Sequence, residues 1–74
     1  MHKIFVRVLT NHSAQGTMPI AYSHGYGQIV RVKKVLKKET IDGIVRYTCQ
    51  TPNGDVLLYE PREYGEWHVE KAHA

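Results

Sequence analysis

Residues 44–60, IVRYTCQTPNGDVLLYE, decide the fold class of this chain. Two runs of β-branched, aromatic and aliphatic residues flank a Thr-Pro-Asn-Gly segment at 51–54. Proline presets φ for the second position of a turn and glycine accepts positive φ, so this segment predicts a tight reversal. The flanking runs predict a β-hairpin with strands over 44–50 and 55–60. In the first of these strands, alternation directs three side chains inward: Val45, Tyr47 and Cys49.

Three further strands are expected outside this hairpin, over 3–10, 28–39 and 66–70. All three contain Val or Ile, whose branched side chains suit a pleated surface better than a helix. A turn over 40–43 precedes the hairpin, because Asp and Gly tolerate positive φ. A 3₁₀ turn is expected over 61–65, where a proline ends the preceding strand.

The strand over 28–39 needs an irregularity. Strict alternation would place Lys34 on the same face as two valines that belong in the core. A bulge or bend near Lys33 and Lys34 would return Val35 to the core side. We therefore expect the backbone to depart from regular pairing at that point.

Residues 11–27 separate the first two expected strands. This segment contains Asn, Ser, Gly and Pro, so the sequence predicts a long loop. Its second half includes Met18 and Tyr22, which would anchor it to the core, and an extra strand over 18–22 is an open alternative. Loops carry binding residues more often than strands do, so this loop is a candidate for specific function.

The pattern predicts an all-β fold. Five short strands, tight turns and no helical periodicity are typical of a small barrel, which buries a shared interior and removes exposed sheet edges. The chain has 74 residues, of which 42% are hydrophobic, enough for one thin core. We therefore expect a single domain over 1–74.

The segment over 25–69 resembles the SH3-like barrels. GYGQIV at 25–30 is similar to the glycine-then-Ile/Val entry of KOW-type strands, and the hairpin follows it. YEPREY at 59–64 is similar to the strand, 3₁₀ turn and final strand that close such barrels. Small prophage and plasmid proteins include barrels of this kind. The resemblance implies a five-stranded SH3-like barrel with a long loop after the first strand.

Two functions of these families can be compared with the chain. Peptide-binding SH3 domains use a tyrosine pair and a tryptophan, and this chain has Tyr59, Tyr64 and Trp67 but lacks the Ala-Leu-Tyr-Asp-Tyr motif. The type II dihydrofolate reductases have Val-Gln-Ile-Tyr where this chain has Leu57 and Leu58 at the two middle positions. Leucine cannot hydrogen-bond a pterin or nicotinamide amide. A reductase-like enzyme is thus a third hypothesis behind two binding functions.

Positive charge is concentrated in the expected second strand. The chain carries ten Lys and Arg against seven Asp and Glu, and its net charge is +3. A stripe of cations releases counterions from phosphates and so favours binding of DNA or RNA. The plain alternative is a solvated outer strand, since lysines also block edge pairing. The candidate nucleic-acid-binding residues are Arg31, Lys33, Lys34, Lys37, Lys38 and Arg46.

Aromatic residues support a second hypothesis, a protein- or peptide-interaction module. Exposed aromatic side chains together with the 11–27 loop could contact a host or phage protein. The structural alternative is that they close the barrel. The candidate protein-binding residues are Tyr22, Tyr26, Tyr59, Tyr64 and Trp67.

No catalytic, metal or cofactor pattern is present in the sequence. The five histidines are scattered, without the short paired spacing of zinc ligands. Cys49 is the single cysteine, which suits a reducing compartment. The first residues lack the apolar region of a signal peptide, and no apolar run approaches a membrane span. We expect a cytoplasmic, non-enzymatic binding module without metal or cofactor.

Overall fold

The computed structural model describes residues 4–14, 16–24, 27–62 and 65–72. The described residues are all-β, without helices, and form one antiparallel sheet in the order β3-β2-β1-β7-β6-β5-β4. The strands are β1 (Ile4–Ser13), β2 (Gly16–Ser23), β3 (Ile29–Arg31), β4 (Lys34–Ile41), β5 (Ile44–Thr51), β6 (Gly54–Glu60) and β7 (Trp67–Lys71).

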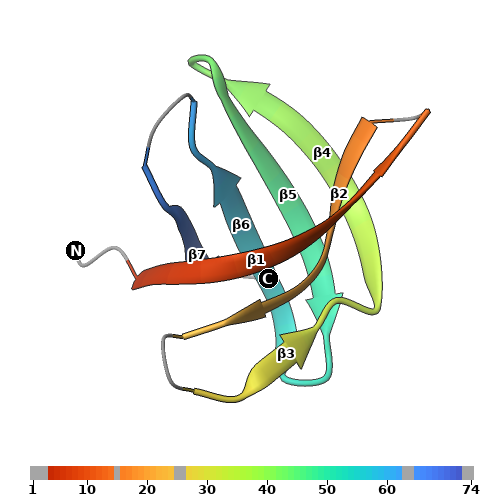
Figure 1. Ribbon diagram of the computed structural model, residues 1–74, viewed down its shortest axis with the longest axis vertical. Helices are drawn as coiled ribbons and strands as arrows, with labels where there is room; N and C mark the ends of the chain where they lie inside the picture. Colours follow the sequence, from red (N-terminus) through yellow and green to blue (C-terminus); the bar gives the residue numbers. More distant parts are fainter. Residues whose placement is uncertain (1–3, 15, 25–26, 63–64, 73–74) are drawn as a thin grey trace.

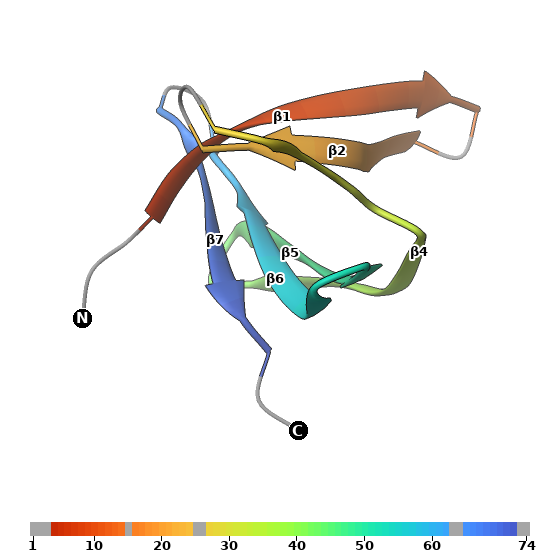
Figure 2. The ribbon, with the colours of Figure 1, turned by 90° about the horizontal axis from the view of Figure 1, so that it is seen from below.

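The sheet curls into a half-barrel because β1 pairs with different strands along its length (Figure 1). Its start, Ile4 to Val6, pairs with β7, and its remainder pairs with β2. Figure 2 shows β1 and β2 lying across the open side of the layer made by β4, β5 and β6. The right-handed twist of strands favours such curling, which encloses one face of the sheet.

The two ends of the sheet meet at Val32 and Lys33. These two residues join β3 to β4, the strands at opposite ends of the sheet order. The Val32 amide donates to the carbonyl of Ile20 in β2 at 3.0 Å, and the Lys33 amide donates to the carbonyl of Gln50 in β5 at 2.7 Å. Adjacent amides thus bond to β2 and β5, the strands next to the two ends of the sheet, and keep the half-barrel curled.

The core fills the inner face of the curled sheet. Tyr47 and Leu58 are completely buried. They are paired directly on the neighbouring strands β5 and β6, so their side chains lie next to each other on the inner face. Every second residue of these strands points inward, as the period of a strand requires. The buried cluster comprises Val6, Tyr22, Tyr47, Cys49, Val56, Leu58 and Val69. The expected inward direction of Tyr47 and Cys49 is confirmed, and Val45 packs against the same cluster.

The expected count of five strands is wrong, and so is the long loop over 11–27. β1 continues to Ser13, and β2 occupies 16–23 and pairs with it, so the alternative of an extra strand is confirmed. Pro19 lies beside a register shift in β1, where a missing N–H is tolerated. Burial of Pro19, Ala21 and Tyr22 holds β2 in place.

The expected bend in the strand over 28–39 is confirmed. Pairing stops at Val32 and Lys33, which divides the strand into β3 and β4, and the register shifts again between Val35 and Lys37. Val35 packs against the core, as the sequence predicts. The shift leaves Leu36 as the extra residue of a bulge, so the residues after it change faces.

The hairpins have the turn chemistry that the sequence predicts. Asp42 and Gly43 form a two-residue connection with φ of 52° and 79°, the left-handed conformation of a type I′ turn. Gly54 closes the next turn with φ of 107°. The strands expected over 44–50, 55–60 and 66–70 match β5, β6 and β7 to within about one residue at each end. The 3₁₀ turn expected over 61–65 falls partly on residues 63 and 64, which lie outside the described residues.

Leu57 and Leu58 give a matched test of this arrangement, because they are neighbours on opposite faces of β6. Leu58→Ala removes a completely buried side chain and is expected to lower the free energy of unfolding by about 2–5 kcal/mol. Leu57→Ala is expected to cost about 1 kcal/mol or less. Urea unfolding followed by circular dichroism measures both. Equal losses for the two variants would contradict the assignment of faces.

Candidate functional site

One row of side chains crosses the outer face of the sheet over five strands. Register pairs Glu39 with Arg46, Arg46 with Tyr59, Tyr59 with His68 and His68 with Phe5. Directly paired residues of antiparallel strands point to the same face. Their chain neighbours Tyr47, Leu58 and Val69 are buried in the core, so the row lies on the outer face. We call these five residues the outer row.

The aromatic part of the outer row is ordered by ring contacts. The rings of Tyr59 and His68 stack, with centroids 4.3 Å apart and planes 4° apart. Phe5 meets His68 edge-on, with centroids 6.4 Å apart and planes at 76°. Phe5 is 52% exposed, so its ring offers apolar surface to solvent. Contacts across strands hold these rings in one arrangement before any ligand arrives.

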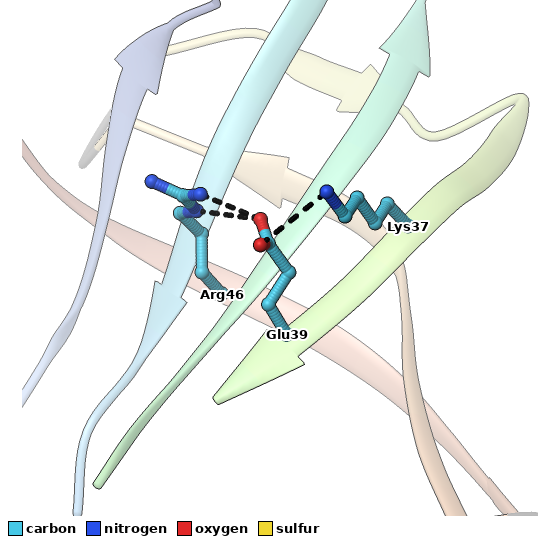
Figure 3. Close-up of polar contacts among 3 residues, drawn as sticks. All are labelled: Lys37, Glu39 and Arg46. Carbon is cyan, nitrogen blue, oxygen red and sulfur yellow. Dashed lines mark hydrogen bonds and ion pairs between the residues drawn. The ribbon is translucent and has the colours of Figure 1, made fainter. Parts of the chain in front are cut away.

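The polar part of the outer row is an ion-pair chain centred on Glu39 (Figure 3). Arg46 donates to Glu39 Oε1 from Nε at 3.2 Å and from Nη2 at 2.5 Å. Lys37 Nζ lies 3.4 Å from Glu39 Oε2. The hydrogen bond from Arg46 is the largest cause that lowers the pKa of Glu39. The pKa of Arg46 is raised, first by its hydrogen bond to Glu39 and then by one to Tyr59. Arg46 thus joins the acidic and aromatic parts of the row.

A recess of about 310 Å³ adjoins the aromatic part of the row. Phe5, Tyr59 and His68 line one side, and Ile44 and Pro61 contribute further apolar surface. Charged residues also border it, namely Arg62, Glu60 and Glu66. The Arg62 guanidinium lies over the β4–β5 turn, where a Cβ built at Gly43 would come within 2.7 Å of Nη2. The outer face therefore combines a cluster of aromatic rings with nearby cations.

The cations of the basic segment are divided among different surfaces. Lys34 and Lys37 face outward with Arg46, because the bulge at Leu36 resets the alternation of β4. Lys38 pairs with Tyr47 on the inner side, and its Nζ lies 5.5 Å from the Tyr47 ring centroid. Two other candidates lie elsewhere, Arg31 opposite Ala21 of β2 and Lys33 in the connection to β4.

The aromatic candidates are also separated. Tyr59 lies in the outer row, whereas Trp67 packs against the core and stacks on Tyr47 with centroids 5.7 Å apart. Tyr22 is buried and meets the ring of His24 edge-on. Tyr26 and Tyr64 lie outside the described residues. The described members of this set do not share one surface, and a protein-binding role for them stays a prediction.

Three residues of the outer row were not singled out from the sequence as site residues: Phe5, Glu39 and His68. Alternation in the first strand already places Phe5 opposite the inward valines, so an outward aromatic ring could have been noticed. Register between strands distant in sequence is what brings His68 beside Phe5 and Tyr59. No local pattern contains that information.

Other chemistry has little support among the residues that the structure describes. Within them, no three His, Cys, Asp or Glu side chains gather as a metal site, and no helix is long and apolar enough to cross a membrane. Of the two leucines relevant to the reductase hypothesis, Leu58 is in the core and Leu57 is half-buried on the outer face. That hypothesis stays a prediction.

The ion-pair chain predicts a pH dependence of stability. Because the folded-state pKa of Glu39 is lowered, its charge stabilises the fold above the ordinary pKa of 4.5, and this contribution is lost as pH falls through the lowered value. In Glu39→Gln the decrease of melting temperature between neutral and acidic pH is expected to be shallower. Arg46→Gln should flatten the profile similarly, since it removes the other partner. Thermal melts at a series of pH values test this, and an unchanged profile in both variants would contradict the pairing.

Comparison with known proteins finds no similar family or protein. No protein-family model matches the chain, no curated protein matches it, and no solved structure matches it. The all-β class and the curled antiparallel sheet are compatible with a small barrel, whereas the relationship to SH3-like proteins stays a prediction.

Proposed function

We propose that the chain is a non-enzymatic module that binds single-stranded nucleic acid on its outer face. The observation that supports this most strongly is the outer row, in which Phe5, His68 and Tyr59 lie side by side on adjacent strands next to Arg46. Proteins that bind unpaired strands combine aromatic rings, on which bases stack, with cations that follow the backbone.

The recess beside the row is suited to one base. Phe5 is half exposed and makes no face-to-face stack with another ring among the described residues, so a base can lie against it. Tyr59 and His68 stack with each other and line the same recess. An unpaired base can enter because its faces are free, whereas bases within a duplex are already stacked. The geometry thus favours single strands over duplexes.

Cations near the recess would contact the phosphates. Arg62 borders the recess, and Arg46 and Lys37 continue along the outer face. Glu39 accepts from Arg46 and pairs with Lys37, so it offsets part of their charge while fixing their positions. Exposed ion pairs of this kind are weakened by salt. We expect binding of moderate strength that weakens as salt concentration rises.

Fluorescence anisotropy with a short labelled single strand, in DNA and RNA forms, tests the proposal. Phe5→Ala removes a stacking surface worth about 1–3 kcal/mol and is expected to weaken binding about 5- to 150-fold. Leu9→Ala is the matched control, because Leu9 is on the same strand and 62% exposed, about 13 Å from Phe5 along the strand. It should leave affinity unchanged. Failure of the unmodified protein to bind either strand at low salt would overturn the proposal.

Charge variants separate stacking from phosphate contact. Lys37→Gln should reduce the slope of log affinity against log salt concentration by about one, since it removes one phosphate partner. Glu39→Gln should raise affinity, because Lys37 and Arg46 lose a competing anion. The same anisotropy titrations, repeated over a range of salt, measure both effects. If Glu39→Gln weakened binding, phosphate contact by Lys37 and Arg46 would be contradicted.

A further inference from the structure

A second recess, of about 360 Å³, lies on the opposite, inner side of the sheet. The apolar part of its wall comprises Tyr22, Val56 and Val69 of the core cluster, together with Val30 and Ile4. Polar residues complete its lining, namely His24, Gln28, Asn53, Glu70 and Lys71. Ile4 pairs with Val69 and therefore faces the same side. The mouths of β-barrels are common sites for small ligands, and recesses of roughly this size suffice. This one shares no lining residue with the recess beside the outer row.

Tyr22 brings a hydrogen-bond donor to this recess. The residue is only 5% exposed, and burial is the main cause that raises its pKa, so the hydroxyl stays protonated. No described residue hydrogen-bonds that hydroxyl, yet no fully buried side-chain oxygen or nitrogen among them lacks a partner. The hydroxyl must therefore be the part of the side chain that solvent still reaches. Tyr22 lines the inner recess, and its ring belongs to the core cluster.

Lys71 supplies a cation at the border of the same recess. Register pairs it with Val56, whose side chain points inward, so Lys71 projects to the inner side as well. It takes part in no ion pair among the described residues. Glu70, the other charged residue at the border, pairs with Leu57 and is directed to the outer face. His24 also lines the recess and contacts the Tyr22 ring edge-on.

We propose that this recess binds a small organic carboxylate with an apolar body of two fused rings. An apolar cavity of about 150 Å³ holds benzene, so a volume of about 360 Å³ admits a larger ring system. The rings lie against Val30, Val56 and Val69. The carboxylate accepts a hydrogen bond from the Tyr22 hydroxyl and pairs with the Lys71 ammonium, both of which would otherwise be hydrated.

Titration of the ¹⁵N-labelled full chain with 2-naphthoate, followed by amide chemical shifts, tests this site. Saturable shift changes are expected at Val30, Val56 and Val69, with smaller changes at Phe5 and Tyr59 of the outer row. The neutral analogue 2-naphthamide should bind more weakly, because it cannot pair with Lys71. Absence of saturation in the millimolar range, changes centred on the outer row, or equal affinity for the two probes would each overturn the proposal.

Three variants assign the polar partners, and their amide spectra report directly whether each one is folded. Lys71→Met should weaken naphthoate binding by up to about fivefold and leave naphthamide binding unchanged. Tyr22→Phe should weaken binding of both probes by about fivefold, because each carries an oxygen that accepts from the hydroxyl. Lys34→Met, a lysine change on the outer face, is the matched control and should have no effect. Equal behaviour of Lys71→Met and Lys34→Met would remove Lys71 from the site.

Discussion

Two neighbouring amides, those of Val32 and Lys33, bond to β2 and β5, the strands next to the opposite ends of the sheet, and the remaining structure depends on this constraint. Without it the edge strands β3 and β4 could separate, and a sheet this small would expose its inner face. With it, β2 is held across β5, so that the hydroxyl of Tyr47 donates to Glu60 at 2.7 Å and lies 3.2 Å from the Thr17 carbonyl. Trp67 stacks on the same ring.

In this arrangement the two faces of the sheet carry different features. The inner face carries the core and, at one end, a recess bordered by Tyr22 and Lys71. The outer face carries the outer row, from Glu39 to Phe5, whose side chains take no part in the core cluster. Because neighbouring residues of a strand point to opposite faces, side chains of the row can vary with little effect on the core. The proposed binding functions use both faces without sharing side chains.

The sequence predicted the fold best where local turn chemistry and alternation agree. The hairpin of β5 and β6 follows from its turn at 51–54 and from the alternation of Val45, Tyr47 and Cys49. The sequence predicted a loop where β2 lies, because the segment contains residues typical of loops. Its pairing with β1 and the burial of Pro19 make that segment a strand. The candidate site was less predictable from the sequence than the fold. A bulge at Leu36 reassigns the faces of Lys37 and Lys38, and the outer row is created by register between distant strands.

The position of Cys49 gives the molecule an internal reporter of its own opening. Its side chain is completely buried within the core, and burial raises its pKa to about 11, so at neutral pH it is an inert thiol. Alkylating reagents can reach the sulfur only when β5 separates from its neighbours. Since Cys49 is the single cysteine of the chain, the rate of its modification measures local unfolding of the central strands without any added label.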